Sequence, residues 1–353
     1  MTVKKEVFGK LNDGREAHLF TLTNKNGFRL LITNFGGRMV QLWTPDRNGR
    51  LADIITGFDN LEQYVNRNPY FGAVVGRYAN RIANSKFTLN GKNYDLVPSQ
   101  LPELVHHLHG GIANFSYTLW NAEILDEPDG GKLRLTLTSP DGDQGYPGKV
   151  DVEVVYTLTK DNGLSLGYFA KTGADTPVNL TNHVYFNLAG HSSGPVLDHK
   201  IRIDSDFYLP VDPAGIPLGE RAKVEGTPFD LRAMTKIGSR YNDSHVQMAQ
   251  QSGFDVHYYF NKGKELKKVC ELEEPGQGRR MEVWTTKPGM QFYTGNKITA
   301  NTFKGKGGYV YAQYGGLCLE TQFPPDSPNR SNASEVILRP GVEYRHETVY
   351  RFC

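Results

Sequence analysis

The segment Val150-Asp151-Val152-Glu153-Val154-Val155-Tyr156-Thr157-Leu158 decides the fold class, because an apolar side chain stands at every second position. Successive side chains of a β-strand point to opposite faces, so a period of two predicts a strand with one buried face. The segment Leu133-Arg134-Leu135-Thr136-Leu137-Thr138 repeats this pattern. Both segments are therefore expected to lie with one face on a core and the other toward solvent.

Tight turns separate such runs. Asn-Gly pairs stand at Asn26-Gly27, Asn48-Gly49, Asn90-Gly91 and Asn162-Gly163. Both residue types tolerate the positive φ angles of hairpin turns, so these pairs predict antiparallel connections. Helical signals are short, at 61–64 and 244–251. We therefore predict an all-β fold, a large antiparallel β-sandwich, and a single domain over residues 1–353, since no composition break or repeat divides the chain.

Composition indicates an ordinary globular protein of 353 residues, 38% hydrophobic and 22% charged. A formal net charge of +2, with no run of five basic residues, argues against nucleic acid or an anionic membrane as partner. We find neither 18 consecutive apolar residues nor an apolar leader, so we expect no spanning helix and no secretion. Three cysteines, Cys270, Cys318 and Cys353, are an odd number, which favours reduced thiols and a cytoplasmic location.

Two distant segments carry candidate acid–base chemistry. His183 lies in the segment 179–188 and Glu320 in the segment 315–322, each in an otherwise apolar, strand-like context. Reference pKa values of about 6.5 and 4.3 make histidine and glutamate a natural acid and base near neutral pH. A lone histidine on a strand is more often structural, whereas a buried carboxylate must be partnered or functional. Together the two residues suit proton transfer on oxygen without a cofactor.

His109 belongs to a second cluster, His106-His107-Leu108-His109-Gly110-Gly111. Three neighbouring histidines suggest zinc, but no Cys or His pair with finger spacing follows, so we favour a hydrogen-bonding role over a metal site. The two glycines would let the backbone approach a ligand closely. Arg81 offers a rigid fork of donors for vicinal hydroxyls or a carboxylate, although its own motif is better explained by a structural arginine.

Two further candidates are Asp255, in Gly253-Phe254-Asp255, and Gln291, in the segment 289–296. Alone, the first could be a turn residue and the second a surface amide. The aromatic residues Tyr185, Phe292 and Tyr293 are individually expected in the core. The sequence contains no Gly-x-Ser-x-Gly elbow, phosphate-binding loop or dinucleotide fingerprint, so neither ATP nor NAD is expected, and no cofactor or metal is predicted.

Taken in order along the chain, these segments resemble the aldose 1-epimerase (galactose mutarotase) family. The resemblance covers nearly the whole chain and implies a β-sandwich that interconverts the α and β anomers of hexoses such as galactose and glucose, without a metal. The segments that carry it are 71–82, Leu108-His109-Gly110-Gly111, Gln144-Gly145-Tyr146-Pro147-Gly148, Asn179-Leu180-Thr181-Asn182-His183, Gly253-Phe254-Asp255, 291–296, Leu319-Glu320-Thr321-Gln322 and Leu338-Arg339-Pro340-Gly341.

The resemblance also implies roles for the candidate residues. Glu320 would be the general base on the C1 hydroxyl and His183 the general acid at the ring oxygen, and His109 is counted with this catalytic group. The residues that would hold or polarise the sugar are Asn80, Arg81, Asp255 and Gln291. The expected partner is therefore a small aldose sugar, bound by a monomer or homodimer.

The chain departs from the family pattern near the site. His106 replaces the usual asparagine, Asn114-Phe115-Ser116-Tyr117 replaces Gly-Phe-Asp-Lys, and Val256 replaces a histidine, with His257 one step later. These departures bear on the preferred sugar more than on the acid and base. Three alternatives stay open: a non-catalytic sugar-binding protein, a hexose-6-phosphate epimerase, and a glycoside hydrolase using Glu320 and Asp255 as facing carboxylates.

Overall fold

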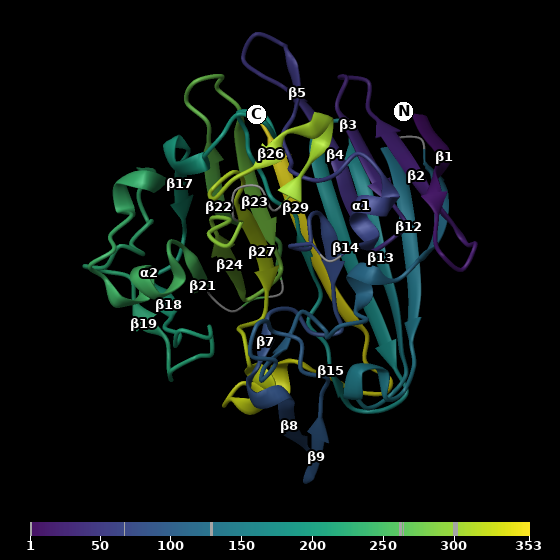
Figure 1. The fold of residues 1–353 in the computed structure, drawn as a ribbon, viewed down its shortest axis with the longest axis vertical. Coiled ribbons are helices and arrows are strands. Elements are labelled where there is room, and N and C mark those ends of the chain that lie inside the picture. Colours follow the sequence, from purple (N-terminus) through teal and green to yellow (C-terminus); the bar gives the residue numbers. More distant parts are fainter. Residues whose placement is uncertain (1, 67, 128–129, 261–262, 264, 299–302) are drawn as a thin grey trace.

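The computed structural model describes residues 2–66, 68–127, 130–260, 263, 265–298 and 303–353. Within these ranges the α-helices are two, α1 (Leu61–Val65) and α2 (Val246–Gln251), both close to the short helical signals in the sequence. Antiparallel strands, with short 3₁₀ helices in some of their connections, make up the rest of the regular framework (Figure 1), so the prediction of an all-β sandwich is confirmed. No helix in the described ranges combines the length and the apolar character needed to cross a membrane.

One layer of the sandwich is an antiparallel nine-stranded sheet in the order β11-β12-β13-β14-β29-β23-β22-β17-β20. The last strand in sequence, β29, runs between β14 and β23 in the middle of this sheet (Figure 1). The bounds are β11 Asn121–Glu127, β12 Gly130–Ser139, β13 Val150–Thr159, β14 Gly163–Thr172, β17 Lys200–Ile203, β20 Thr235–Lys236, β22 Lys267–Glu273, β23 Arg280–Thr285 and β29 Tyr344–Phe352.

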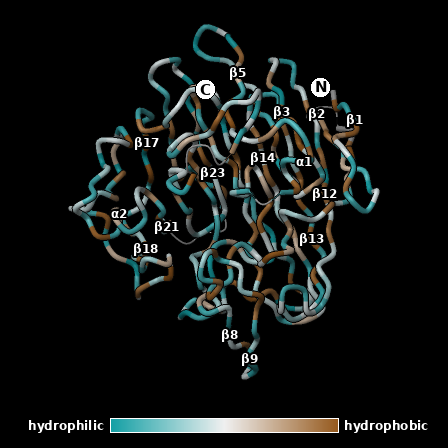
Figure 2. The backbone as a smooth tube through the Cα atoms, in the orientation of Figure 1, coloured by the Kyte–Doolittle hydropathy of each residue, from teal (hydrophilic) through white to brown (hydrophobic). Residues whose placement is uncertain are grey.

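The alternation in the sequence sets the register of this sheet. In β12 and β13, Leu133 lies opposite Tyr156 and Leu135 opposite Val154, so the apolar residues of both strands share one buried face. Short hydrophobic and hydrophilic stretches alternate along these strands (Figure 2). Shifting either strand by one residue would turn its apolar side chains to solvent, which makes this register the stable one.

The second layer consists of two five-stranded sheets with the pair β6–β16 between them. One sheet runs β1-β2-β3-β4-β5 and the other β19-β18-β21-β24-β27, and β16 also lies against β27. The bounds are β1 Thr2–Lys10, β2 Glu16–Thr23, β3 Arg29–Thr33, β4 Arg38–Pro45, β5 Leu51–Asp53, β6 Ala73–Val75, β16 Thr181–His183, β18 Phe207–Leu209, β19 Ala222–Lys223, β21 Asp255–Tyr259, β24 Gly289–Tyr293 and β27 Cys318–Gln322.

The main core lies between the two layers, and this determines where the site forms. Phe292 of β24 and Leu319 of β27 belong to the same buried cluster as Tyr350 of β29. Because side chains alternate along a strand, Gln291 and Glu320 point to the opposite face of the second layer. The catalytic candidates therefore stand on the outer face of this layer, under the connecting segments that cover it.

All four Asn-Gly pairs lie in hairpins, as the sequence predicts. They join β2 to β3, β4 to β5, β8 (Lys86–Leu89) to β9 (Lys92–Asp95), and β13 to β14. At the third pair Asn90 and Gly91 have φ angles of 51° and 76°, the positive values that these residues tolerate. The remaining short strands are paired as β7 (Arg81–Ile82) with β10 (His107–Leu108), β15 (Thr176–Pro177) with β28 (Ile337–Leu338), and β25 (Phe303–Lys304) with β26 (Val310–Tyr311).

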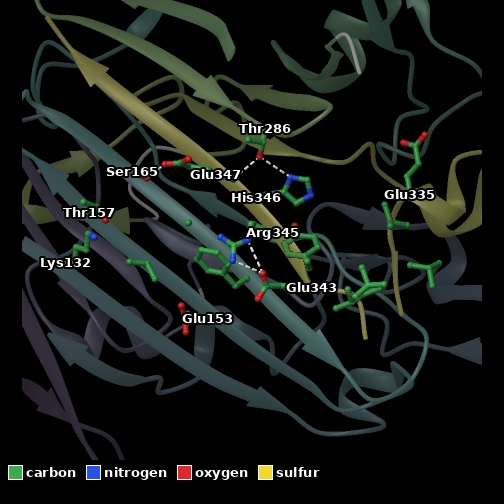
Figure 3. A pocket seen from close by; sticks show the side chains of 18 of the residues that line it. Lys132, Glu153, Thr157, Ser165, Thr286, Glu335, Glu343, Arg345, His346 and Glu347 are labelled. Atoms are coloured by element: carbon green, nitrogen blue, oxygen red, sulfur yellow. Dashed lines mark hydrogen bonds and ion pairs between the residues drawn. The ribbon is translucent and has the colours of Figure 1, made fainter. Parts of the chain in front are cut away.

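A groove of about 780 Å³ crosses the face of the nine-stranded sheet that points away from the core. Figure 3 shows polar side chains along it, and most are paired: Arg345 binds Glu343 at 2.8 Å, and the Ser165 hydroxyl donates to Glu347 at 2.6 Å. None of the seven candidate site residues is among the described residues that line it. The groove and the candidate site thus lie on opposite sides of the sandwich.

Candidate active site

Three neighbouring strands place an amide and two carboxylates on one face. Gln291 of β24 lies opposite Glu320 of β27, and Asp255 of β21 lies opposite Tyr293 of β24. The Gln291 side-chain amide donates to Asp255 Oδ1 at 2.7 Å. Glu320 Oε2 and Gln291 Oε1 are buried and find no hydrogen-bond partner among the described residues, so both are ready to accept donors from a ligand.

His183 ends the short strand β16 and faces Glu320. Its Nε2 atom lies 3.7 Å from Glu320 Oε1, and the two residues are 5% and 2% exposed. In a cyclic hemiacetal the hydroxyl oxygen and the ring oxygen are bonded to the same carbon. A base and an acid 3.7 Å apart can therefore each contact one of these two oxygens. The pair that the sequence singles out therefore meets in one buried site.

His109 joins this pair through a turn shared with Asn80. Asn80 and His109 have φ angles of 64° and 51°, and each backbone N–H points at the other residue. The Asn80 N–H donates to His109 Nδ1 at 3.2 Å, and the His109 N–H donates to the Asn80 carbonyl at 3.0 Å. The ring centroid of His109 lies 5.1 Å from that of His183. Because His109 Nδ1 accepts the hydrogen bond from the Asn80 N–H, the imidazole proton of His109 lies on Nε2.

The glycines after His109 serve a different contact from the one expected. A Cβ on Gly110 would lie 1.9 Å from the Gly76 carbonyl oxygen, and one on Gly111 would lie 2.3 Å from Gln144 Oε1. Gly110 also has a φ of 85°, which favours glycine. The close approach is therefore to the protein's own backbone and side chains, and it fixes the turn that carries His109.

Arg81 is held in the site by two amides. Its Nε atom donates to Gln100 Oε1 at 2.9 Å and its Nη1 atom to Asn80 Oδ1 at 3.2 Å. Gln100 in turn donates to the Ala214 carbonyl at 2.8 Å. Sequence reasoning missed Gln100, because it lies in an irregular segment where no period or motif marks it.

Burial dominates the electrostatics of the three central groups. It raises the pKa of Glu320 well above its ordinary value, with a further increase from Asp255 and a decrease from Arg81. Burial lowers the pKa of His183 to about 4 and that of His109 well below its ordinary value. Both imidazoles are consequently neutral at pH 7, and Glu320 is a stronger base than an exposed carboxylate.

Ligand atoms of His109, His183 and Glu320 all lie within 4.8 Å of one another, a spacing close enough for one metal ion. An imidazole that binds a metal uses a bare nitrogen and donates its other N–H to a neighbour. His109 does the reverse, because its Nδ1 accepts from the Asn80 backbone and its proton must face the site. The residues therefore fit hydrogen bonding to a ligand better than metal binding, as the sequence analysis favours.

Aromatic rings form one wall of the site. The rings of Tyr70, Tyr185 and Tyr293 lie with centroids 5.8, 5.0 and 6.4 Å from that of His183. The expectation that Tyr185, Phe292 and Tyr293 are core residues is confirmed. Phe292 belongs to the main core, and the two tyrosines belong to a second buried cluster that also lies against His183. Tyr70 carries no sequence signal and was missed.

Two of the residues at which the sequence departs from the family pattern lie beside the site or in the core beneath it. The His106 carbonyl accepts hydrogen bonds from the backbone N–H groups of Ser99 and Gln100. These bonds fix the segment from which the Gln100 side chain binds Arg81. Val256 packs into the core, whereas His257 faces the site side and is buried, with no partner for either ring nitrogen among the described residues. All seven candidates gather in one site, while their individual roles stay predictions.

Comparisons with known proteins agree with this geometry. The family model described as Aldose 1-epimerase matches residues 18–351. The galactose mutarotases of Bos taurus and Homo sapiens are each 44% identical over 354 residues, covering 100% and 99% of this chain and 99% and 98% of theirs. The aldose 1-epimerase of Escherichia coli (strain K12) is 38% identical over 343 residues, 96% of each chain.

Solved structures give the same result for the fold. The galactose 1-epimerase from Lactobacillus acidophilus NCFM superimposes with a TM-score of 0.85 at 26% identity, covering 100% of this chain and 98% of that one. The GalM/aldose epimerase homologue from C. elegans gives a TM-score of 0.85 at 28% identity, covering 96% and 99%. Because the family match and the curated relatives both extend over nearly all of the sequence, the chain belongs to the aldose 1-epimerase family.

Proposed function

We propose that the protein is an aldose 1-epimerase, a mutarotase that interconverts the α and β anomers of hexoses such as galactose and glucose without a cofactor. The observation that carries this proposal is the buried pair of Glu320 and His183, whose facing atoms lie 3.7 Å apart. Relatives that match the chain from end to end are galactose mutarotases, which supports the same isomerase activity.

The geometry suggests how the reaction proceeds. Glu320 takes the proton of the C1 hydroxyl while His183 gives one from Nε2 to the ring oxygen, and the bond between C1 and the ring oxygen breaks to leave an aldehyde. Rotation about C1–C2 presents the other face of the carbonyl. Reclosure then reverses both transfers, since the ring oxygen returns its proton to His183 and the new C1 oxygen takes one from Glu320.

The remaining residues would hold the sugar and stabilise charge. The neutral His183 and His109 imidazoles are both suited to donate, and a neutral imidazole can stabilise an oxygen on which charge develops. Arg81 supplies a cationic fork, and the buried amide–carboxylate pair supplies acceptors. Each buried polar group that a wrong ligand leaves unpaired weakens the binding free energy by about 1–3 kcal/mol. The site can therefore discriminate among polyols. The sugar-binding residues proposed on this basis are Asn80, Arg81, Asp255 and Gln291.

Polarimetry of freshly dissolved α-galactose and α-glucose tests the proposal directly. A mutarotase should bring either solution to its equilibrium rotation faster than buffer alone, with a rate proportional to enzyme concentration. No acceleration at high enzyme concentration, together with saturable sugar binding, would leave only the non-catalytic sugar-binding protein. Release of an aglycone from glycosides would instead support the hydrolase alternative, in which Glu320 and Asp255 act as the two carboxylates.

The pH dependence of catalysis should show the raised pKa of Glu320. The base must be ionised, so kcat/KM should fall as the pH drops through this raised pKa, at a higher pH than for an ordinary carboxyl. His183, whose pKa burial lowers to about 4, becomes protonated only at a still lower pH. Replacing Asp255 with asparagine removes a charge that raises the Glu320 pKa, so the acid limb should move to lower pH. A pH series of kcat/KM for both proteins measures this shift, and an unmoved or upward-moved limb would contradict it.

We also propose that residues 1–353 act as one domain, in the cytoplasm, as a monomer or homodimer. A single buried cluster that includes residues from Phe20 to Phe352 supports the first point. The free thiols of Cys270, Cys318 and Cys353 support the second, because cysteines stay unpaired where the compartment is reducing. The small net charge supports a small sugar, rather than nucleic acid or a membrane, as the partner.

A further inference from the structure

Cys318 touches the nitrogen of His183 that faces away from Glu320. Its Sγ atom lies 3.5 Å from His183 Nδ1, within hydrogen-bonding distance for sulfur, and its side chain is fully buried. Cys318 and Glu320 stand two residues apart on β27, so alternation places both on the site face. Strand β27 therefore carries Glu320, the proposed base, and also contacts the Nδ1 side of His183, the proposed acid.

The thiol has a second buried partner. Against the larger effect of burial, the Tyr185 phenol lowers the pKa of the thiol, and Tyr185 follows His183 by two residues, with its ring centroid 5.0 Å from that of the imidazole. Burial raises the pKa of both the thiol and the phenol well above their ordinary values, so both keep their protons at neutral pH. These contacts form a chain in which the phenol can donate to sulfur and the thiol to the imidazole.

We propose that Cys318 is a positioning residue whose S–H donates to His183 Nδ1 and so holds the imidazole proton on Nε2, the nitrogen that faces Glu320. This inference rests on the proposed role of His183 as the acid.

The choice of tautomer decides the direction of proton transfer. With the proton on Nε2, His183 can only donate toward the substrate, and Glu320 must act as the base. With the proton on Nδ1, a bare nitrogen would face Glu320 and the roles would be exchanged. A carboxylate in place of Cys318 would accept the Nδ1 proton and favour this second state. A buried neutral thiol avoids that outcome, just as the Asn80 backbone N–H does at His109.

The test compares the full-length protein with Cys318→Ala, Cys318→Ser and Cys270→Ala. Cys270 is the other buried cysteine and lies on β22 of the nine-stranded sheet, so it controls for loss of a buried thiol. The ¹⁵N shifts of the His183 ring, assigned by their loss in His183→Asn, report which nitrogen is protonated. We expect Nε2 protonated in the wild type, in Cys270→Ala and in Cys318→Ser, and a mixture of tautomers in Cys318→Ala.

The kinetics should follow the tautomer. Cys318→Ala should lower kcat on the order of tenfold with little change in KM, as for other groups that orient a functional histidine. Cys318→Ser keeps a donor and should restore most of the loss. An Nε2-protonated His183 in Cys318→Ala, or equal losses in both Cys318 variants with unchanged ¹⁵N shifts, would overturn the inference. A wild type without mutarotase activity would instead refute the proposed function, while the ring shifts would still report the hydrogen bond.

Discussion

Replacement of Glu320 with glutamine should lower kcat by roughly 10³-fold, within the range of about 10²–10⁴ that a positioned acid or base contributes. Glutamine keeps the size and the hydrogen-bonding geometry of the side chain but cannot accept the C1 proton. The carboxylate is also buried with one oxygen unpartnered, so a neutral amide should be well tolerated in the fold. Polarimetric kcat, with circular dichroism to verify folding, measures the effect.

Glu347→Gln provides the matched control for this change. Glu347 lies in the groove on the opposite side of the sandwich, where Figure 3 shows it near Ser165, so the same chemical change there should leave kcat unaltered. Sugar affinity of the Glu320→Gln protein should persist, because the other binding residues are unchanged. Turnover near that of the wild type would show that Glu320 is not the base.

Local patterns predicted the fold class and part of the framework, because they act on neighbouring residues. Alternation identified β12 and β13, and the positive φ required at Asn-Gly pairs identified four hairpins. These signals depend only on side-chain direction and on backbone sterics, so tertiary context did not override them. The same alternation, with Leu319 in the core, also accounts for the direction in which Glu320 points.

The supporting parts of the site could not be predicted in this way. Gln100 reaches Arg81 from an irregular segment, and Tyr70 reaches His183 from another. Neither residue belongs to a motif or a periodic run, and their positions depend on contacts between segments far apart in the chain. The sequence predicts only a reduced thiol at Cys318, because its contact with His183 Nδ1 exists only once β16 lies against β27. Side chains that orient the reacting groups are thus less visible in a sequence than the reacting groups themselves.

Replacement of His183 with asparagine should lower kcat by roughly 10²–10³-fold, because the shorter amide leaves no donor at the position of Nε2. The amide can still occupy the region beside Cys318, so we expect a folded protein and a melting temperature close to that of the wild type. His346→Asn is the matched control: His346 lies in the groove on the opposite side of the sandwich, where the Thr286 hydroxyl lies 3.2 Å from its Nδ1 atom, so turnover should persist.

The double variant Glu320→Gln/His183→Asn gives the sharper test of the pair. An acid and a base that act in one concerted step lose most of their effect when either is removed, so the double variant should be little slower than the slower single variant. Fully multiplicative losses would mean that the two residues contribute independently. The 3.7 Å separation of Nε2 and Oε1 predicts the first result, because groups this close serve the same hemiacetal.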